Sequence, residues 1–160
     1  MIDTLERLNR ILGRLLLGIA GFFLLFMLAL ACGNMLLRAI WEPLKGTFEL
    51  MGFAGAITAA FSMAATQQGQ GHIVVSFFKG RFPPAVEKLL VAVSQVAGIL
   101  LFTVVTWQSW RWAGSLLASD EVSETLRIVY YPFAFAVALG FGALALSLIT
   151  DLCLLSRRSG

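Results

Sequence analysis

Charged residues divide the chain into four long uncharged segments. These segments lie between Arg14 and Arg38, Glu49 and Lys79, Lys88 and Arg111, and Arg127 and Asp151. Each contains at least 22 consecutive uncharged positions, mostly Leu, Ala, Phe, Val and Gly. A helix of about 20 apolar residues crosses the hydrocarbon core of a bilayer. The pattern therefore predicts an all-α membrane protein, with one membrane domain over residues 1–160 and four transmembrane helices near residues 13–38, 49–70, 85–112 and 127–154.

The first twelve residues have a different, two-sided pattern. Apolar side chains recur at helical spacing, while charged side chains occupy the other faces. The apolar positions are Ile2, Leu5, Leu8, Ile11 and Leu12, and the charged positions are Asp3, Glu6, Arg7 and Arg10. This pattern predicts an amphipathic N-terminal lead-in that lies along the membrane surface before the first crossing.

The composition leaves little material for a folded aqueous domain, since 59% of the residues are hydrophobic and only 13% are charged. Eight of the twelve Lys and Arg residues fall in the two terminal segments and the middle connection. Because Lys and Arg accumulate on the cytoplasmic side, we expect both termini in the cytoplasm. The predicted location is the bacterial inner membrane, and no nucleic-acid partner is expected.

Small residues recur at every fourth position of the second segment. They are Gly52, Ala56, Ala60 and Ala64. Such a stripe lets a second helix approach closely, which favours association in lipid. The second helix is therefore expected to be central, packed against another helix of this chain or of a partner.

The residues needed for catalysis or for a cofactor are not evident. His72 is the only histidine, so the chain by itself cannot supply a bis-histidine haem site or a zinc cluster. No Ser, His and Asp arrangement or glycine-rich phosphate loop is evident. We therefore expect neither an enzyme nor a bound cofactor.

A transporter that acts alone places ionisable or unwound segments near the bilayer midplane, and the four segments contain no charge there. An accessory subunit that works in a complex fits this pattern best. Two alternatives are a small self-dimerising four-helix exporter and the membrane anchor of a redox enzyme. The exporter needs an acid within the first helix, and residues 15–37 contain none.

The order of several polar residues is similar to that of a known family. Asn34 and Arg38 stand four residues apart at the end of the first segment, Glu49 opens the second, and Gly71, His72 and Ile73 follow it. This order resembles the small permease subunit (DctQ-like) of tripartite ATP-independent periplasmic (TRAP) transporters. A Trp of the family pattern is replaced here by Gly46.

The resemblance implies two protein partners. One is a large TRAP permease subunit that carries the substrate and sodium sites, and the other is a periplasmic substrate-binding protein that commonly delivers an organic acid. The small subunit would be a scaffold in this sodium-driven uptake and would perform no chemistry.

The resemblance also implies positions for the candidate residues. Arg38 and Glu49 become outer-face candidates for an interfacial ion pair, with Asn34 hydrogen-bonding nearby. Gly71, His72 and Ile73 would shape a cytoplasmic turn. Helix capping or headgroup anchoring is the alternative for each of these residues.

The basic residues around the middle connection have a simpler expected partner. Lys79, Arg81 and Lys88 lie on the side predicted to be cytoplasmic. We expect them to contact the anionic headgroups of membrane lipids.

Overall fold

The computed structural model describes residues 2–70 and 84–158. Within these ranges the chain forms four helices: α1 (Ile2–Ile40), α2 (Thr47–Gln70), α4 (Pro84–Ser119) and α5 (Tyr131–Arg158). Each helix is long and apolar enough to cross a membrane. The predicted all-α architecture with four membrane-spanning helices is therefore confirmed.

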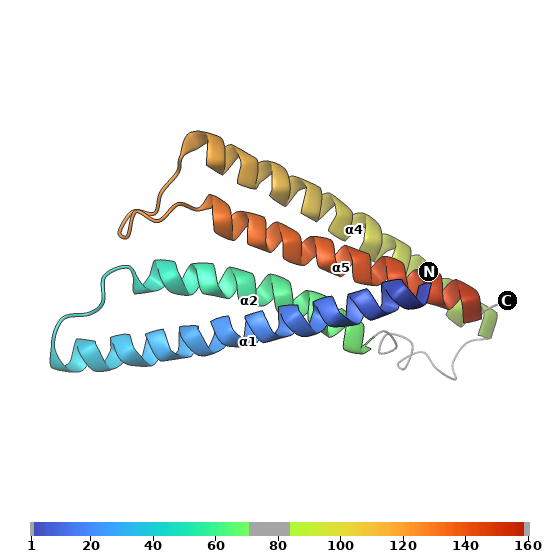
Figure 1. The fold of residues 1–160 in the computed structure, drawn as a ribbon, viewed down its shortest axis with the longest axis horizontal. Coiled ribbons are helices and arrows are strands. Elements are labelled where there is room, and N and C mark those ends of the chain that lie inside the picture. Colours follow the sequence, from blue (N-terminus) through green and yellow to red (C-terminus); the bar gives the residue numbers. More distant parts are fainter. Residues whose placement is uncertain (1, 71–83, 159–160) are drawn as a thin grey trace.

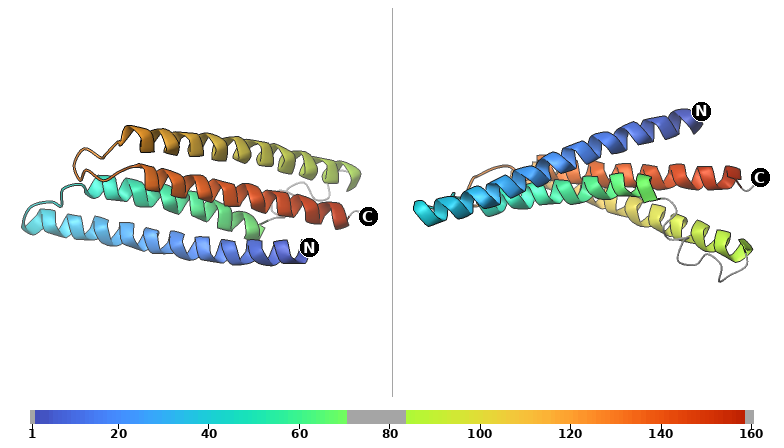
Figure 2. Two further views of the ribbon diagram at one scale, coloured as in Figure 1. Left: turned by 45° about the horizontal axis from the view of Figure 1, so that its top comes forward. Right: turned by 90° about the horizontal axis from the view of Figure 1, so that it is seen from below.

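The helices form a layer of two hairpins in the spatial order α1, α2, α5, α4 (Figure 1). The closest packing joins α1 to α2, α2 to α5, and α5 to α4. Both termini lie at one end of the layer, which we call the terminal end. The α1–α2 and α4–α5 connections lie at the opposite end, which we call the loop end. At the terminal end α1 and α4 diverge to opposite sides of α5 (Figure 2).

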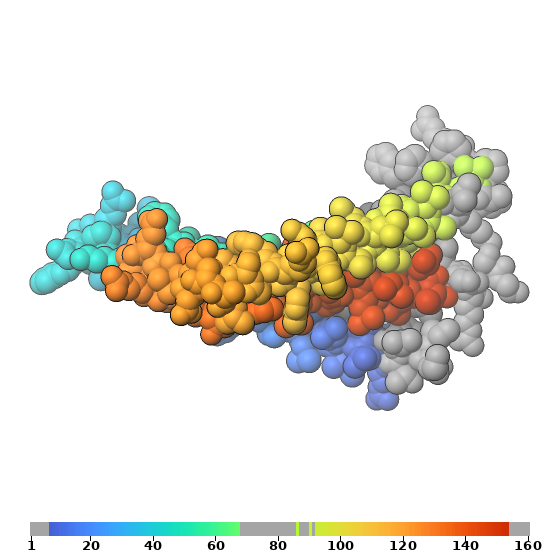
Figure 3. Space-filling model, turned by 90° about the horizontal axis from the view of Figure 1, so that it is seen from above, coloured from blue at the N-terminus to red at the C-terminus, as the bar shows by residue number. Residues whose placement is uncertain are grey.

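This arrangement makes α5 and α2 the inner helices. In the most apolar stretch of α5, half of the residues are buried within the chain. The corresponding shares are 28% in α2, 11% in α1 and 6% in α4. Figure 3 shows α4 lying along the outside of the layer, with almost its whole length open in that view. The two outer helices therefore expose most of their apolar surface on the outside of the four-helix layer.

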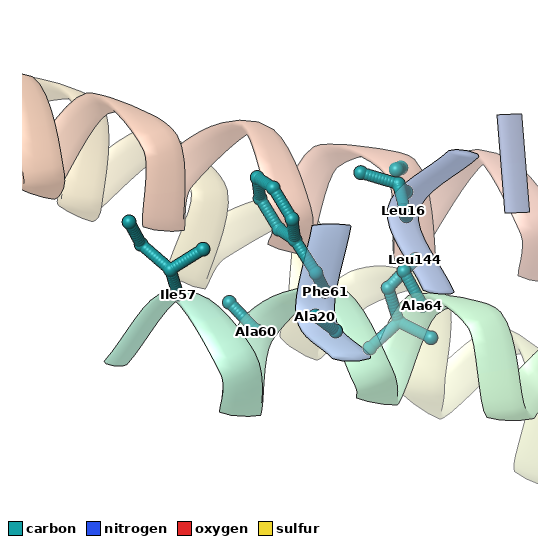
Figure 4. Packing of buried hydrophobic residues seen from close by; sticks show 8 residues of the cluster. Leu16, Ala20, Ile57, Ala60, Phe61, Ala64 and Leu144 are labelled. Carbon is teal, nitrogen blue, oxygen red and sulfur yellow. The ribbon is translucent and has the colours of Figure 1, made fainter. Parts of the chain in front are cut away.

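The main core joins three helices at the middle of the layer. It contains Leu16 and Ala20 from α1, Ile57, Ala60, Phe61 and Ala64 from α2, and Ala143 and Leu144 from α5. Figure 4 shows Phe61 projecting from α2 toward α5. Nearby, a Cβ atom added to Gly140 would lie 2.9 Å from the Cβ of Ala60. Helices α2 and α5 therefore approach closely at Ala60 and Gly140, as small residues allow.

The N-terminal lead-in is not a separate surface segment, because α1 runs without interruption from Ile2 to Ile40. Gly13 and Asn9 are buried one and two turns before Leu16, respectively. The contact between Asn9 and Ser147 keeps this part of α1 beside α5. The expected position flat along the membrane surface is therefore corrected.

The fourth helix begins at Tyr131 rather than at residue 127. Arg127 has a φ of +53°, which is outside the right-handed helical region. The preceding residues instead form a tight hairpin with a bridge between Val122 and Val129. The third membrane helix is longer than expected and reaches Ser119, because Ala113 and Leu116 pack in a second cluster with Ala134 of α5.

Candidate functional site

The two hairpins meet at the loop end through a carboxylate that binds backbone amides. Glu49, in the first turn of α2, accepts hydrogen bonds from the backbone N–H groups of Thr125 (2.8 Å) and Leu126 (3.0 Å). Both donors belong to the α4–α5 connection, so this contact ties the first hairpin to the second. Charged acceptors make stronger hydrogen bonds than neutral ones. We call Gly46, Glu49, Thr125 and Leu126 the loop-end junction.

Gly46 completes this junction by leaving room for Leu126. Its φ is +79°, a conformation that glycine adopts without the steric cost that other residues incur. A Cβ atom at this position would also overlap the side chain of Leu126. The absence of a side chain at residue 46 therefore allows the α1–α2 connection to contact the α4–α5 connection.

Asn34 organises the start of the same connection from the last turns of α1. Its Oδ1 accepts a hydrogen bond from the backbone N–H of Leu44 at 2.9 Å. The hydroxyl of Thr47 donates to the carbonyl of Leu44 at 2.7 Å. These two contacts hold the connection between the end of α1 and the start of α2.

Arg38 lies one turn after Asn34 and its side chain is exposed. The oxygens of Glu49 are bound to the amides of Thr125 and Leu126. Within residues 2–70 and 84–158, no ion pair joins Arg38 to Glu49. The two candidates for an ion pair therefore have different environments, one solvent-facing and one in the loop-end junction.

The small-residue stripe of α2 is divided between two environments. Ala60 and Ala64 are 1% and 0% exposed, and both belong to the core of this chain. Gly52 and Ala56 are exposed. One half of the stripe thus packs inside the chain, and the half toward the loop end remains open.

The open face of α2 differs in composition from the open faces of α1 and α4. After Phe48 and up to Gln67, the exposed positions of α2 are Gly52, Ala56, Ala59, Met63 and Thr66. The outer helices expose more large apolar side chains, including Phe22, Leu25, Leu100, Val104 and Trp107, beside smaller or polar ones such as Gly18, Ala29 and Thr103. Large apolar side chains suit lipid, whereas small ones suit contact with a second helix. The α2 face is therefore the candidate helix-binding surface.

Two grooves run beside α5. One, of about 280 Å³, adjoins the open α2 face and is lined by Ser62, Met63, Thr66, Gln67, Phe102 and Leu144. The other, of about 520 Å³, lies between α4 and α5 and is lined mainly by apolar atoms. The smaller groove places hydroxyl groups of α2 beside the candidate helix-binding surface.

Polar contacts at the terminal end were not anticipated from the sequence. The hydroxyl of Ser147 on α5 donates to Oδ1 of Asn9 on α1 at 2.9 Å, and both side chains are buried. Gln67 of α2 donates to a carboxylate oxygen of Asp151 at 3.4 Å. The available signal was the spacing of Ser147 and Asp151, which lie four residues apart and so share one face of α5.

Several predicted residues lie outside the part of the chain that the structure describes. They are Gly71, His72, Ile73, Lys79 and Arg81. Lys88 lies within α4. In the described ranges, no group of three His, Cys, Asp or Glu side chains could hold a metal ion.

Comparison with known proteins identifies one matching family. Residues 27–158 match the family model described as "Tripartite ATP-independent periplasmic transporters, DctQ component". The matched range covers well over half of the chain and includes both halves of the loop-end junction. No curated protein and no solved structure gives a significant match.

Proposed function

Because the chain belongs to the DctQ family, the small membrane component of TRAP transporters, we propose that it is a scaffold for a large permease subunit. In this proposal the complex takes up organic acids with a sodium gradient, and a periplasmic binding protein delivers the substrate. Family membership carries the proposal. It also favours this function over a self-dimerising exporter or a redox anchor.

The packing of the subunit supports a fixed rather than a moving part. The two hairpins are joined at the loop end by Glu49 and in the middle by the close approach of Ala60 to Gly140. At the terminal end, α1 is joined to α5 by the bond between Ser147 and Asn9. Contacts at three levels along the layer oppose sliding of one hairpin against the other.

We place both termini in the cytoplasm, with the complex in the bacterial inner membrane. This orientation is supported by the basic residues at the terminal end, which include Arg7, Arg10 and Arg14. The loop end then faces the periplasm. Arg38 and the acidic residues of the α4–α5 connection become available there to the periplasmic binding protein.

The open face of α2 is the surface that we assign to the large permease subunit. Gly52 and Ala56 would allow a helix of that subunit to approach the α2 backbone. Thr66 and Ser62 would offer hydroxyl groups to the same partner at the smaller groove. Both hydroxyls already donate to backbone carbonyls of α2, so their oxygens would serve this partner as hydrogen-bond acceptors.

Co-purification with the large permease subunit tests this assignment. Both chains are expressed together, extracted in a mild detergent, and quantified by mass measurement after capture of the small subunit. Ala56→Leu is expected to lower the recovered large subunit several-fold, because the added side chain separates the two helices. Ala29→Leu, an identical change on the exposed face of α1, is the matched control.

Equal recovery of the large subunit with Ala56→Leu and Ala29→Leu would overturn the assignment of the α2 face. Failure of the wild-type chain to retain any large subunit would overturn the scaffold function itself. Ala60→Leu would instead disturb packing within the small subunit, because Ala60 is buried there.

A further inference from the structure

Helix α1 is much longer than a bilayer crossing requires. At about 1.5 Å per residue, its 39 residues span nearly 60 Å, whereas the hydrocarbon core is about 30 Å thick. The uncharged part covers residues 15–37 and accounts for one crossing. The preceding turns, up to Arg14, therefore extend into the headgroup region at the terminal end or beyond it.

The face of these turns that packs against the other helices of the chain is well defined. Asn9, Gly13, Leu16 and Ala20 are buried and follow one another at intervals of three or four residues. They form a continuous contact face, which Asn9 anchors to Ser147 of α5. The orientation of α1 about its own axis is thereby fixed.

The opposite side of α1 carries two parallel rows of exposed residues. One row is basic and contains Arg7, Arg10 and Arg14, all of which are exposed. The other is apolar and contains Leu8, Ile11 and Leu15, which are 56%, 51% and 60% exposed. At 100° per residue the rows lie side by side along the same two turns. We call these six residues the α1 basic–apolar surface.

The chemistry of this surface fits a molecule that is anionic at one end and hydrocarbon at the other. Arginine binds phosphate oxygens through a planar fork of N–H donors. Leu15, at the start of the uncharged segment, offers a surface to an acyl chain, and Ile11, one turn earlier, offers one to the apolar part of the headgroup region. Arg14 borders the uncharged segment, so its guanidinium group lies where lipid phosphates are found.

We propose that the α1 basic–apolar surface is a specific binding site for one anionic phospholipid of the leaflet at the terminal end. The phosphate contacts Arg14 and the neighbouring basic residues, the glycerol backbone lies against Ile11, and an acyl chain runs past Leu15 toward the bilayer core. This site is separate from the open face of α2, and its binding does not depend on the scaffold function. Only the identification of the leaflet as cytoplasmic rests on the proposed orientation.

Native mass spectrometry of the full-length chain with its large subunit tests the site. The complex in detergent is titrated with phosphatidylglycerol or phosphatidylcholine of the same acyl composition. One phosphatidylglycerol is expected to bind with clear preference over phosphatidylcholine. The double variant Arg7→Gln/Arg14→Gln is expected to weaken that binding about twenty- to thirtyfold, since each Arg contributes roughly a factor of five.

Two further variants separate this site from general attraction of lipid. Arg111→Gln removes an exposed charge from the loop-end half of α4 and is expected to leave phosphatidylglycerol binding unchanged. Ile11→Gln/Leu15→Gln is expected to weaken phosphatidylglycerol binding while keeping all charges. Inorganic phosphate at the same concentration is expected not to compete, because it has no acyl chain.

Several outcomes would overturn the proposal. Equal binding of the two lipids would do so, as would an unchanged affinity in Arg7→Gln/Arg14→Gln. Competition by inorganic phosphate would assign the arginines to a free anion instead of a lipid. Loss of the large subunit in the control sample would contradict the scaffold function without affecting lipid binding to the small subunit.

Discussion

Gly46 and Glu49 show how single residues join the two hairpins. Glu49 binds two amides of the α4–α5 connection, and Gly46 admits the side chain of Leu126 beside them. In the family pattern a Trp stands at the position that Gly46 occupies in this chain. The structure gives a local reason for glycine, since both its φ of +79° and the position of Leu126 exclude a larger residue.

Substituting Gly46 by Ala is expected to destabilise the subunit. An L-residue held at positive φ costs about 1–2 kcal/mol, and the new methyl group would also press against Leu126. Thermal unfolding in detergent would measure the loss. Adding Leu126→Ala should recover the crowding part but not the backbone part. If Gly46→Ala unfolds at the wild-type temperature, residue 46 does not have the conformation described.

Removing the carboxylate of Glu49 is expected to loosen the α4–α5 connection. In Glu49→Ala the amides of Thr125 and Leu126 lose their acceptor, so their hydrogen exchange should become several-fold faster. Uptake by the complete transporter should fall as well. Glu42→Gln changes an exposed acid at the same end and is the control.

Arg38→Ala separates a structural effect from an effect on a partner. Because Arg38 is exposed at the loop end, its loss should reduce uptake by the complex without changing exchange at Thr125 and Leu126. Normal uptake in both Arg38→Ala and Glu49→Ala would remove these residues from any functional surface.

At the scale of helices, the closest contact of α2 with α5 depends on small residues near the middle of both helices. Ala60 and Gly140 bring the backbones together, and Phe61 fills the space beside them. The four-residue repeat in the sequence located α2 as an inner helix. It could not distinguish the buried positions from the open ones, because all four residues of the repeat are small and only the neighbouring helices differ.

Gly140→Leu is expected to destabilise the isolated subunit by about 1–3 kcal/mol or more. The added side chain would overlap both Phe61 and the backbone of Ala60, which cannot move aside easily. A lower unfolding temperature in detergent would record the effect. Gly52→Leu, on the exposed part of α2, should leave the unfolding temperature nearly unchanged. Similar losses in both variants would contradict the close approach.

The sequence predicted the helices better than their ends. The uncharged segments gave the number of helices, because crossing a membrane requires long apolar runs. The start of α5 was placed four residues early, since the positive φ of Arg127 depends on hydrogen bonds within the hairpin that precedes it. The bond between Asn9 and Ser147 joins residues 138 positions apart, and the spacing of Ser147 and Asp151 indicates a polar face of α5 without identifying its partner.

At the scale of the whole molecule, the layer has two open sides and two outer helices that are almost unburied within the subunit. Nothing in the described ranges groups three His, Cys, Asp or Glu residues at a possible metal site. This architecture suits a subunit that extends the surface of a larger partner. The substrate path would then belong to that partner.

The subunit alone is expected to transport no solute. Purified chain in liposomes with an imposed sodium gradient should accumulate no organic acid, whereas the complete transporter with its binding protein should. Radiolabelled substrate uptake would measure both. Sodium-driven accumulation by the small subunit alone would contradict the scaffold function. Solute transport by the subunit alone under an imposed proton gradient would support the exporter alternative.

The open face of α2 has a consequence for the cell as well as for the complex. A copy made in excess would leave Gly52, Ala56 and Thr66 facing lipid, where small and polar side chains pack poorly. We expect membrane proteases to degrade such unassembled copies faster than assembled ones. We therefore expect the abundance of this chain to follow the synthesis of its large partner, so that stoichiometry is set after translation, by the lifetime of the unassembled protein.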